Sequence, residues 1–309
     1  MTLVLMRRGG ESIDELVGRY EPQTVPTKKE IEIRGNNQLS KMLEKYKEIF
    51  KEWIQRWRFH RSEFFGTIDL QEIFRPDEIN QFLQATIAYE DASHYRSITA
   101  FVVGRLVQNS YASGNNNFFL NTKGIKELFE LGGYLHGEKK RLLEITIEGN
   151  CGESAFTDVC YVNGKVIGSA GRNFAFRTKK SRLYIEGDTD YGAFQHVNGV
   201  VGNINGNSGS CFGEGAKNSK LRVEGSVVPY GYLASAKKVI AYVGNFMAVK
   251  EKNNRSYVSN GKNCQVVTTD LETKRTFEEY IGRNSVEILH NNITFVYIHK
   301  DGRREVLGK

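Results

Sequence analysis

The chain has 309 residues, which is enough for about two domains and for a sizeable buried core. Its 39% hydrophobic and 26% charged residues are typical of a folded globular protein and exclude a disordered chain. The net charge of +7 is spread over the chain without a basic tail, so charge alone supports nucleic-acid binding only weakly. No apolar run is long enough to span a membrane and no secretory signal is recognisable, so we expect a cytoplasmic protein with no membrane partner.

Residues 1–36 are predicted to be an arm or linker, and residues 37–140 a helical domain. Apolar residues recur every three or four positions from Leu39 to Trp57, which predicts an amphipathic helix. Pro76 opens a second predicted helix, and a third is expected over residues 93–110. A short fourth helix is predicted over residues 123–131, where two glycines would end it.

Basic and aromatic residues alternate at the end of the first predicted helix. Such a pattern is found on nucleic-acid-binding surfaces, which makes Arg56, Arg58 and Arg61 candidate contacts. The tryptophans continue the apolar stripe and basic residues are favoured in a last helical turn, so a structural role is the alternative.

Candidate metal ligands are few. Glu90 and His94 are four residues apart and would share one side of a helix, but no second pair of this kind exists, which favours a capping or ion-pairing role. The other histidines are scattered, and the four cysteines show no Cys-x-x-Cys spacing. We therefore expect free buried thiols, no metal and no cofactor.

A glycine returns every 19 residues between residues 145 and 245. An apolar or aromatic residue precedes each glycine by two positions, and a small polar residue follows it. This fixed period predicts a solenoid of stacked repeats, with the glycines at tight corners in a positive-φ conformation and the polar residues in a ladder. The six repeat glycines are Gly149, Gly168, Gly187, Gly206, Gly225 and Gly244.

Within each repeat the residues before the glycine alternate between apolar and polar, as in Leu183-Tyr184-Ile185-Glu186, which predicts a strand with one buried face. An aromatic residue follows later in five repeats, within one position of a common phase, and is expected to close another side of the core. These aromatic residues are Phe156, Phe174, Phe194, Phe212 and Tyr232.

At these residues the chain resembles the GXGXG domain family, the right-handed β-helix at the carboxyl end of the glutamate synthase large subunit, which is also found in formylmethanofuran dehydrogenase. The segment from Gly206 to Gly213 carries the complete Gly-x-x-Gly-x-x-x-Gly pattern, and the repeats at Gly149 and Gly168 carry part of it. The resemblance covers about a third of the chain. It implies a structural or docking part and carries no catalytic residues.

The glycine period fails after Gly244. Residues 256–270 and 286–309 are predicted to contain strands, with an Asp301-Gly302 hairpin turn, and residues 273–281 a short helix. The fold expected is α+β and multi-domain: the helical domain, a right-handed parallel β-helix with 19-residue coils over residues 141–250, and a β-rich C-terminal cap over residues 251–309.

Only one constellation within the repeats suggests acid–base chemistry, namely Asp188, Asp190 and His196. Turn and ladder roles explain the same residues. The function we expect is a non-catalytic scaffold that binds a protein partner or itself, and we assign no catalytic residue. Two alternatives stay open. One is an enzyme or enzyme subunit, related to glutamate synthase-like amide or one-carbon metabolism. The other is a nucleic-acid binder that uses the arginines named above and a cluster between Arg177 and Arg182.

Overall fold

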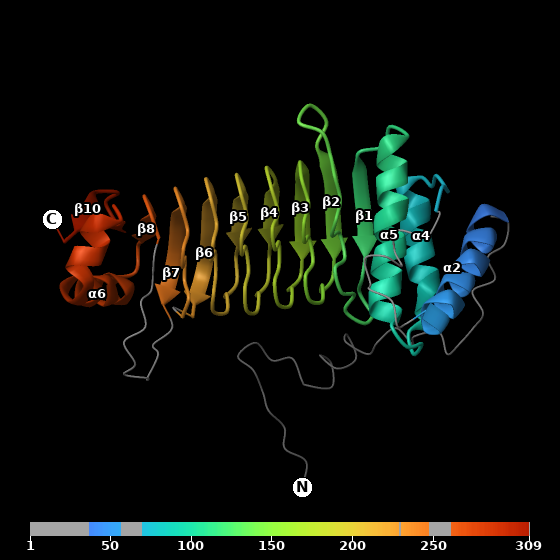
Figure 1. Ribbon diagram of the computed structural model, residues 1–309, viewed down its shortest axis with the longest axis horizontal. Helices are drawn as coiled ribbons and strands as arrows, with labels where there is room; N and C mark the ends of the chain where they lie inside the picture. Colours follow the sequence, from blue (N-terminus) through green and yellow to red (C-terminus); the bar gives the residue numbers. More distant parts are fainter. Residues whose placement is uncertain (1–36, 57–69, 229, 247–260, 309) are drawn as a thin grey trace, which may run out of the picture. The chain divides into compact units, whose positions relative to one another are not determined.

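Ten strands form a single sheet in which every strand pairs with its neighbours in chain order (Figure 1). The computed structural model describes residues 37–56, 70–228, 230–246 and 261–308, and residues 38–309 form one compact unit. The strands are β1 (Asn117–Asn121), β2 (Leu143–Glu148), β3 (Val162–Ile167), β4 (Arg182–Ile185), β5 (Val201–Ile204), β6 (Lys220–Val227), β7 (Ile240–Phe246), β8 (Gln265–Thr268), β9 (Thr294–Ile298) and β10 (Arg304–Leu307). All pairs from β1 to β9 are parallel, and the β9–β10 hairpin is antiparallel around the predicted Asp301-Gly302 turn.

The helices precede the sheet, apart from one near the C-terminus. They are α2 (Asn37–Arg56), α4 (Pro76–Ala85), the 3-10 helix η1 (Thr86–Tyr89), α5 (Tyr95–Ala112) and α6 (Leu271–His290). The three helices predicted first therefore exist close to their expected bounds. The segment predicted as a helix over residues 123–131 is instead a series of turns, because its backbone bonds to the next repeat, as in Glu130 N–H to Glu153 O at 2.8 Å.

The 19-residue period is the stacking register of the strands. Residues 19 positions apart are direct partners from β2 to β6, as in Ile147 with Val166 and Ile185 with Ile204. Two further rows of parallel bridges keep the same spacing at other points of each repeat, for example Cys151 with Ala170 and Cys160 with Lys179. Each repeat thus pairs with the next at three places.

One predicted phase is wrong. Between β6 and β7 the offset grows to 20 residues, so Val223 pairs with Val243 and not with Tyr242. An irregularity between Val223 and Ser226 restores the 19-residue offset at Ser226 and Asn245. The extra residue is absorbed as a local bulge.

A ladder of small polar side chains joins the repeats at one corner, as predicted. The side-chain oxygens of Asn150, Ser169, Asp188 and Asn207 each accept a bond from the backbone N–H of the equivalent residue one repeat on, at 2.6–3.0 Å. These bonds satisfy backbone donors that the turn would otherwise leave without partners.

The reason predicted for the corner glycines is correct only at the start of the row. Gly149 has a φ of 122°, but Gly187, Gly206, Gly225 and Gly244 do not have positive φ. A Cβ at Gly206 would lie 2.6 Å from the carbonyl carbon of Gly187, and one at Gly225 2.6 Å from the carbonyl oxygen of Gly206. Glycine is needed there because the preceding repeat passes too close for a side chain.

The predicted aromatic residues form one continuous buried row. Ring centroids lie 5.4–5.9 Å apart from Phe156 to Tyr232, and the first four rings meet edge to face. Phe246, Phe277 of α6 and Phe295 of β9 extend the row. The core of the repeats therefore continues into the C-terminal elements, although the glycine period has ended.

Other elements cover both ends of this core. Helix α4 packs on β1, where Asn80 Oδ1 accepts from the backbone N–H of Asn121 at 2.8 Å and Gln84 Nε2 donates to its carbonyl at 2.5 Å. At the other end α6 runs to His290, well beyond the predicted 273–281, and contacts β7, β9 and β10. Residues 286–290, predicted as the start of a strand, belong to this helix because Ile288 packs inward from it.

Candidate functional site

The three residues of the predicted acid–base site do not interact with one another, because each makes its own contact with a different part of the repeats. Asp188 accepts from the backbone N–H and the side-chain amide of Asn207, at 2.6 and 3.1 Å. Asp190 caps the backbone N–H of Tyr191 at 2.7 Å and faces Arg172, while the His196 ring lies edge to face on Phe176 with centroids 5.5 Å apart. Each side chain has a structural partner of its own.

A polar cluster that the sequence did not reveal lies around Cys211. Its thiol bonds with the Tyr191 hydroxyl, and Gln195 Nε2 donates to Glu214 at 2.8 Å. Burial raises the pKa of the Cys211 thiol; the bond with Tyr191 lowers it in part, and the nearby Glu214 carboxylate raises it. The cysteine is thus held as a neutral thiol, which is a poor nucleophile and a poor metal ligand.

Glu90 and His94 do not form a ligand pair. Glu90 ends η1 and bonds through its carboxylate to the backbone N–H of Lys126, whereas His94 precedes α5 with a φ of 64°. Among the described residues no group of three His, Cys, Asp or Glu side chains could hold a metal ion. Both residues stand at helix ends, Glu90 after η1 and His94 before α5, but the His94 side chain makes no capping hydrogen bond with α5. All four cysteines are free, and Cys160 is half-buried where the others are buried.

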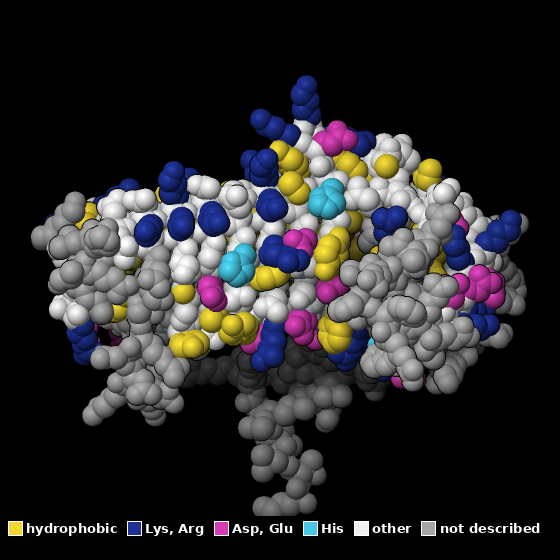
Figure 2. All heavy atoms as spheres, in the orientation of Figure 1, with side chains coloured by type: hydrophobic (Ala, Val, Ile, Leu, Met, Phe, Trp, Pro, Cys, Tyr) yellow, Lys and Arg dark blue, Asp and Glu magenta, His cyan; other side chains and the backbone are white. Residues whose placement is uncertain are grey.

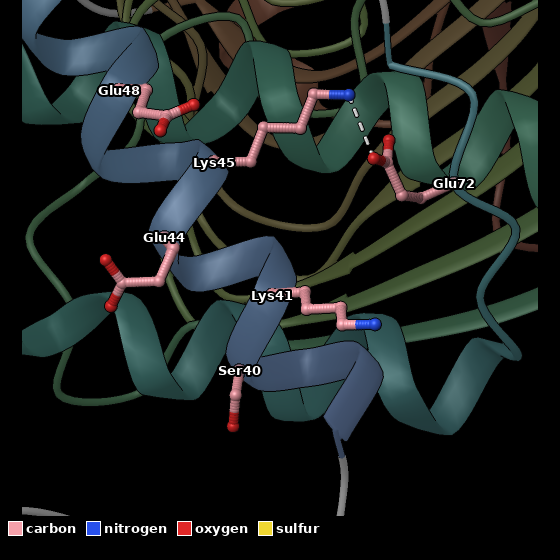
Figure 3. A pocket seen from close by; sticks show the side chains of 6 residues that line it. All are labelled: Ser40, Lys41, Glu44, Lys45, Glu48 and Glu72. Carbon is pink, nitrogen blue, oxygen red and sulfur yellow. Dashed lines mark hydrogen bonds and ion pairs between the residues drawn. The ribbon is translucent and has the colours of Figure 1, made fainter.

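An open cavity of about 510 Å³ lies along α2 (Figure 3). It is lined by Ser40, Lys41, Glu44, Lys45, Glu48 and Glu72, and Lys45 reaches across it to Glu72 at 2.9 Å. Both charges of this pair are partly exposed and neutralise one another. The cavity is a polar surface hollow rather than a shaped pocket for an apolar ligand.

The predicted arginine contacts are only partly within the described residues. Helix α2 ends at Arg56, and the side chain of Arg56 lies outside the described part of the chain together with Arg58 and Arg61. Arg177 is bound to Asp158, with its Nε 3.0 Å from Oδ2, and lies against the Phe176 ring. The cluster from Arg177 to Arg182 is therefore divided, because Arg177 is neutralised and its neighbours are not.

The neighbours of Arg177 belong to a row of exposed cations at the corner where each repeat enters its long strand. One row of parallel bridges runs through Lys179, Asn198, Lys217, Lys237 and Lys262. Lys180 and Lys238 occupy the next position, and Arg182 and Lys220 begin β4 and β6. We call these cations the basic ridge: Lys179, Lys180, Arg182, Lys217, Lys220, Lys237, Lys238 and Lys262. Figure 2 shows Lys and Arg side chains aligned along the stack of repeats.

The basic ridge contains no acidic residue. The segments that carry it are residues 178–183, 197–202, 216–221, 236–241 and 261–266, and they hold eight Lys or Arg residues and no Asp or Glu. The bridge row itself starts two rungs earlier, at His136 and Cys160, and Glu138 lies beside that first rung. No ion pair joins a ridge cation to another described residue. Lys180 alone has a described polar contact, with Tyr161, and that hydrogen bond raises its pKa. The ridge therefore carries an unneutralised positive charge.

Charges further along the outer face of these strands, beyond Arg182 and Lys220, behave differently. Lys165 of β3 pairs with Glu186 at 2.9 Å, and Arg222 of β6 binds Glu224, with Nη2 2.9 Å from Oε2. Beyond the first residue of each strand, these cations of the sheet face are therefore paired with carboxylates. Between β2 and β7, the clustering of unpaired positive charges is thus confined to the ridge and is not a general feature of the repeats.

No family model, curated protein or solved structure matches this chain. The role of the basic ridge is therefore argued from its geometry and charge. Sequence reasoning missed the basic ridge, although the signal was present. Lys179 and Lys217 are two periods apart, and Lys237 follows at the one 20-residue interval. The register shift between β6 and β7 hid the row from a strict 19-residue count.

Proposed function

We propose that the chain is a parallel β-helix that works as a non-catalytic binding scaffold, and that it binds an anionic partner through the basic ridge. The observation that carries this proposal is the separation of charge: eight cations line one corner without an ion-pair partner among the described residues, while the other Lys and Arg residues between β2 and β7 pair with carboxylates. Cross-strand neighbours of like charge destabilise a sheet, so a row of this kind has a cost that a bound anion would offset.

The stacking contacts support the scaffold part of the proposal. Residues with acid or base character in the repeats, such as Asp188 and His196, are engaged in the ladder or against an aromatic ring. Three rows of pairing per repeat fit a solenoid whose faces present side chains in straight lines. The likeness to the GXGXG β-helices and its right-handed sense remain predictions, as do the homo-oligomer and the enzyme-subunit alternative. No described helix is long and apolar enough to cross a membrane.

A protein partner with an acidic surface falls within this proposal, and so does any linear polyanion. Binding to heparin tests it directly, because heparin is a linear polyanion and presents a line of negative charges without the shape of any particular protein partner. We expect the wild-type protein to elute from a heparin column at clearly higher salt than the ridge variant Lys217→Gln/Lys237→Gln/Lys262→Gln. A variant with the same change in net charge, Lys41→Gln/Lys51→Gln/Lys300→Gln, is the matched control and should elute close to wild type.

These three control lysines are exposed and lie outside the ridge segments. If the ridge and control variants elute together, the ridge is no binding surface and the proposal is wrong.

A further inference from the structure

We infer that the anionic partner of the basic ridge is the sugar–phosphate backbone of a nucleic acid, which lies along the stack of repeats. This inference rests on the proposed function and goes beyond it by naming the ligand. The residues from Lys179 to Lys262 are five consecutive rungs of one bridge row, four of which are lysine. At about 4.8 Å between parallel neighbours, the row is about 19 Å long and straight.

A straight row of closely spaced cations matches a ligand whose negative charges also lie in a row. A nucleic-acid strand carries one phosphate for about every 3.4 Å of duplex axis, and a duplex one charge for about every 1.7 Å, so about 19 Å of either presents several phosphates to the ridge. Lysine side chains are long enough to adjust the mismatch between the two spacings. Neutralising phosphates releases counterions, which makes clustered cations effective in this use.

The backbone beneath the lysines is held in place by side chains that point inward. Ser181 Oγ donates to the Lys179 carbonyl at 2.7 Å and accepts from the Val162 N–H one repeat earlier at 3.1 Å. Ser219 repeats both bonds two repeats later, to Lys217 at 2.6 Å and from Val200 at 3.1 Å. The row of charges is therefore set by a rigid frame, which lowers the entropic cost of binding.

Uncharged positions of the same rows also suit phosphate. Asn198 lies in the bridge row between two lysines, and Asn218 and Asn263 occupy the position of Lys180 and Lys238 in their own repeats. Their amide groups are hydrogen-bond donors of the kind that contact phosphate and sugar oxygens. Asn218 Nδ2 also donates one N–H to Asn198 Oδ1 at 3.0 Å, which leaves its second N–H for such a contact. Contacts to phosphate and sugar carry no sequence information, so binding should depend little on sequence.

A membrane fits the ridge less well than a nucleic acid. Surfaces that bind bilayers usually place large apolar side chains among their cations, to enter the interface. Among the described residues of the ridge segments, Val201 is the one exposed large hydrophobic residue. The cations also form a line rather than a plane, which suits a polymer more than a flat sheet of lipid headgroups.

The experiment measures fluorescence anisotropy of a labelled 30-nucleotide single strand and a labelled 20-base-pair duplex, each with mixed sequence, over a range of KCl. Sedimentation with vesicles containing one-fifth phosphatidylserine and competition with polyglutamate are run on the same protein. The full chain, the ridge variant and the matched control variant defined above are compared, and their melting curves show that each is folded.

Full engagement of eight cations would give a slope of log K against log[salt] of about −7 for the duplex and about −6 for the single strand. We expect the ridge variant to reduce the magnitude of this slope by about 2 to 3, because three cations are removed. Its affinity near 0.1 M salt should fall by about 30-fold or more, with little change in the control. Scrambling the sequence should leave the affinity unchanged.

The outcomes separate the two proposals. Wild-type protein that binds heparin through the ridge, but prefers vesicles or polyglutamate to both nucleic acids, overturns the nucleic-acid inference and leaves the proposed function standing. Equal loss of nucleic-acid binding in the ridge and control variants also overturns it, because net charge would then explain the result. Failure to bind any of these polyanions overturns both.

Discussion

The interior and the basic ridge of the same repeats follow opposite rules. In the interior, neighbouring repeats place large side chains against small ones: Ala155-Phe156 is followed by Phe174-Ala175, then by Ala193-Phe194 and Phe212-Gly213. On the ridge, neighbouring repeats place like against like, with Lys217, Lys237 and Lys262 in direct succession. Complementary neighbours stabilise a stack and like charges destabilise it. The interior therefore stabilises the fold, whereas the arrangement of the ridge is explained by binding.

The interior alternation has a period of two repeats. From Phe156 to Phe212, repeats whose ring occupies the second of the two positions carry glycine in the strand that follows, and the others carry leucine. The repeat of Tyr232 departs from this rule, with Ala241 at the equivalent position. A Cβ at Gly164 would lie 2.6 Å from the Phe156 ring, and a Cβ at Gly202 2.5 Å from the Phe194 ring. The rings from Phe156 to Phe212 thereby meet edge to face instead of colliding at a spacing of about 4.8 Å, whereas Phe212 and Tyr232 are stacked.

The largest effect is expected from emptying one of these positions. Phe194 is fully buried between Phe174 and Phe212, with centroids 5.4 and 5.9 Å away. Phe194→Ala should destabilise the protein by about 3–5 kcal/mol, because it removes a large side chain and leaves a cavity. Urea unfolding followed by circular dichroism measures the loss. Phe176→Ala, at a half-buried ring outside the aromatic row, is the control and should cost much less.

A second change tests whether ring and glycine are matched. Gly202→Leu alone should destabilise by about 1–3 kcal/mol, because the new side chain overlaps the Phe194 ring. Together with Phe194→Ala it should be less damaging than the sum of the two, since leucine enters the space that the ring has left. Urea unfolding of the single and double variants measures the coupling, and strict additivity would show that the alternation in sequence has no energetic basis.

The corner glycines give the next effect. Gly206→Ala should cost about 1–3 kcal/mol, since the added methyl would lie 2.6 Å from the backbone of Gly187. Gly282→Ala is the matched control: this glycine lies in α6, is exposed, and has nothing within 4 Å of a new Cβ. The control should stabilise the protein by about 0.5–1 kcal/mol through helix propensity. Equal destabilisation by both changes would contradict the close-approach explanation, and thermal unfolding distinguishes them.

How far the sequence predicts this fold depends on what each signal reports. The 19-residue period predicted the parallel register, the polar ladder and the aromatic row, because a stacked repeat must place equivalent residues one above another. It did not predict the second half of each repeat, where Asn173, Ala175 and Arg177 have φ values of 56°, 61° and 57°. Local propensity disfavours that conformation for such residues, so only bonding between repeats selects it.

The candidate site was predicted less well than the fold. The search for chemistry in single repeats singled out Asp188, Asp190 and His196, which the stacking contacts occupy. The basic ridge becomes visible only when residues 179, 217, 237 and 262 are known to stack, and their unequal spacing conceals that in the sequence. A surface made of one residue from each repeat has no local motif.

The polar ladder gives an effect of intermediate size. Asn207 Oδ1 accepts from the Ser226 N–H at 2.9 Å, and its Nδ2 donates to Asp188 Oδ1 at 3.1 Å. Asn207→Ala should cost about 1 kcal/mol through the lost bonds. Asn207→Asp keeps the acceptor but places a second carboxylate beside Asp188, so its cost should fall as salt is added. Urea unfolding at low and high KCl measures both; a salt-independent loss in the aspartate variant would contradict charge repulsion as its cause.

The smallest effect is expected at the basic ridge, and its sign is opposite. Lys217 and Lys237 are direct partners in the bridge row, so replacing both with glutamine removes a repulsion without removing a described side-chain contact. We expect Lys217→Gln/Lys237→Gln to raise the melting temperature by about 1 to 2 °C in roughly 20 mM salt and to leave it unchanged at about 0.5 M, where the repulsion is screened. Lys51→Gln/Lys300→Gln, which changes the net charge equally at exposed positions outside the bridge row, is the control.

The same variant could gain stability and lose heparin and nucleic-acid binding. That result would show that the ridge lysines lower the stability of the protein while they serve binding, a trade-off that is common at binding sites. A loss of stability would mean that the lysines contribute to stacking, and the clustering of charge would then need no ligand to explain it.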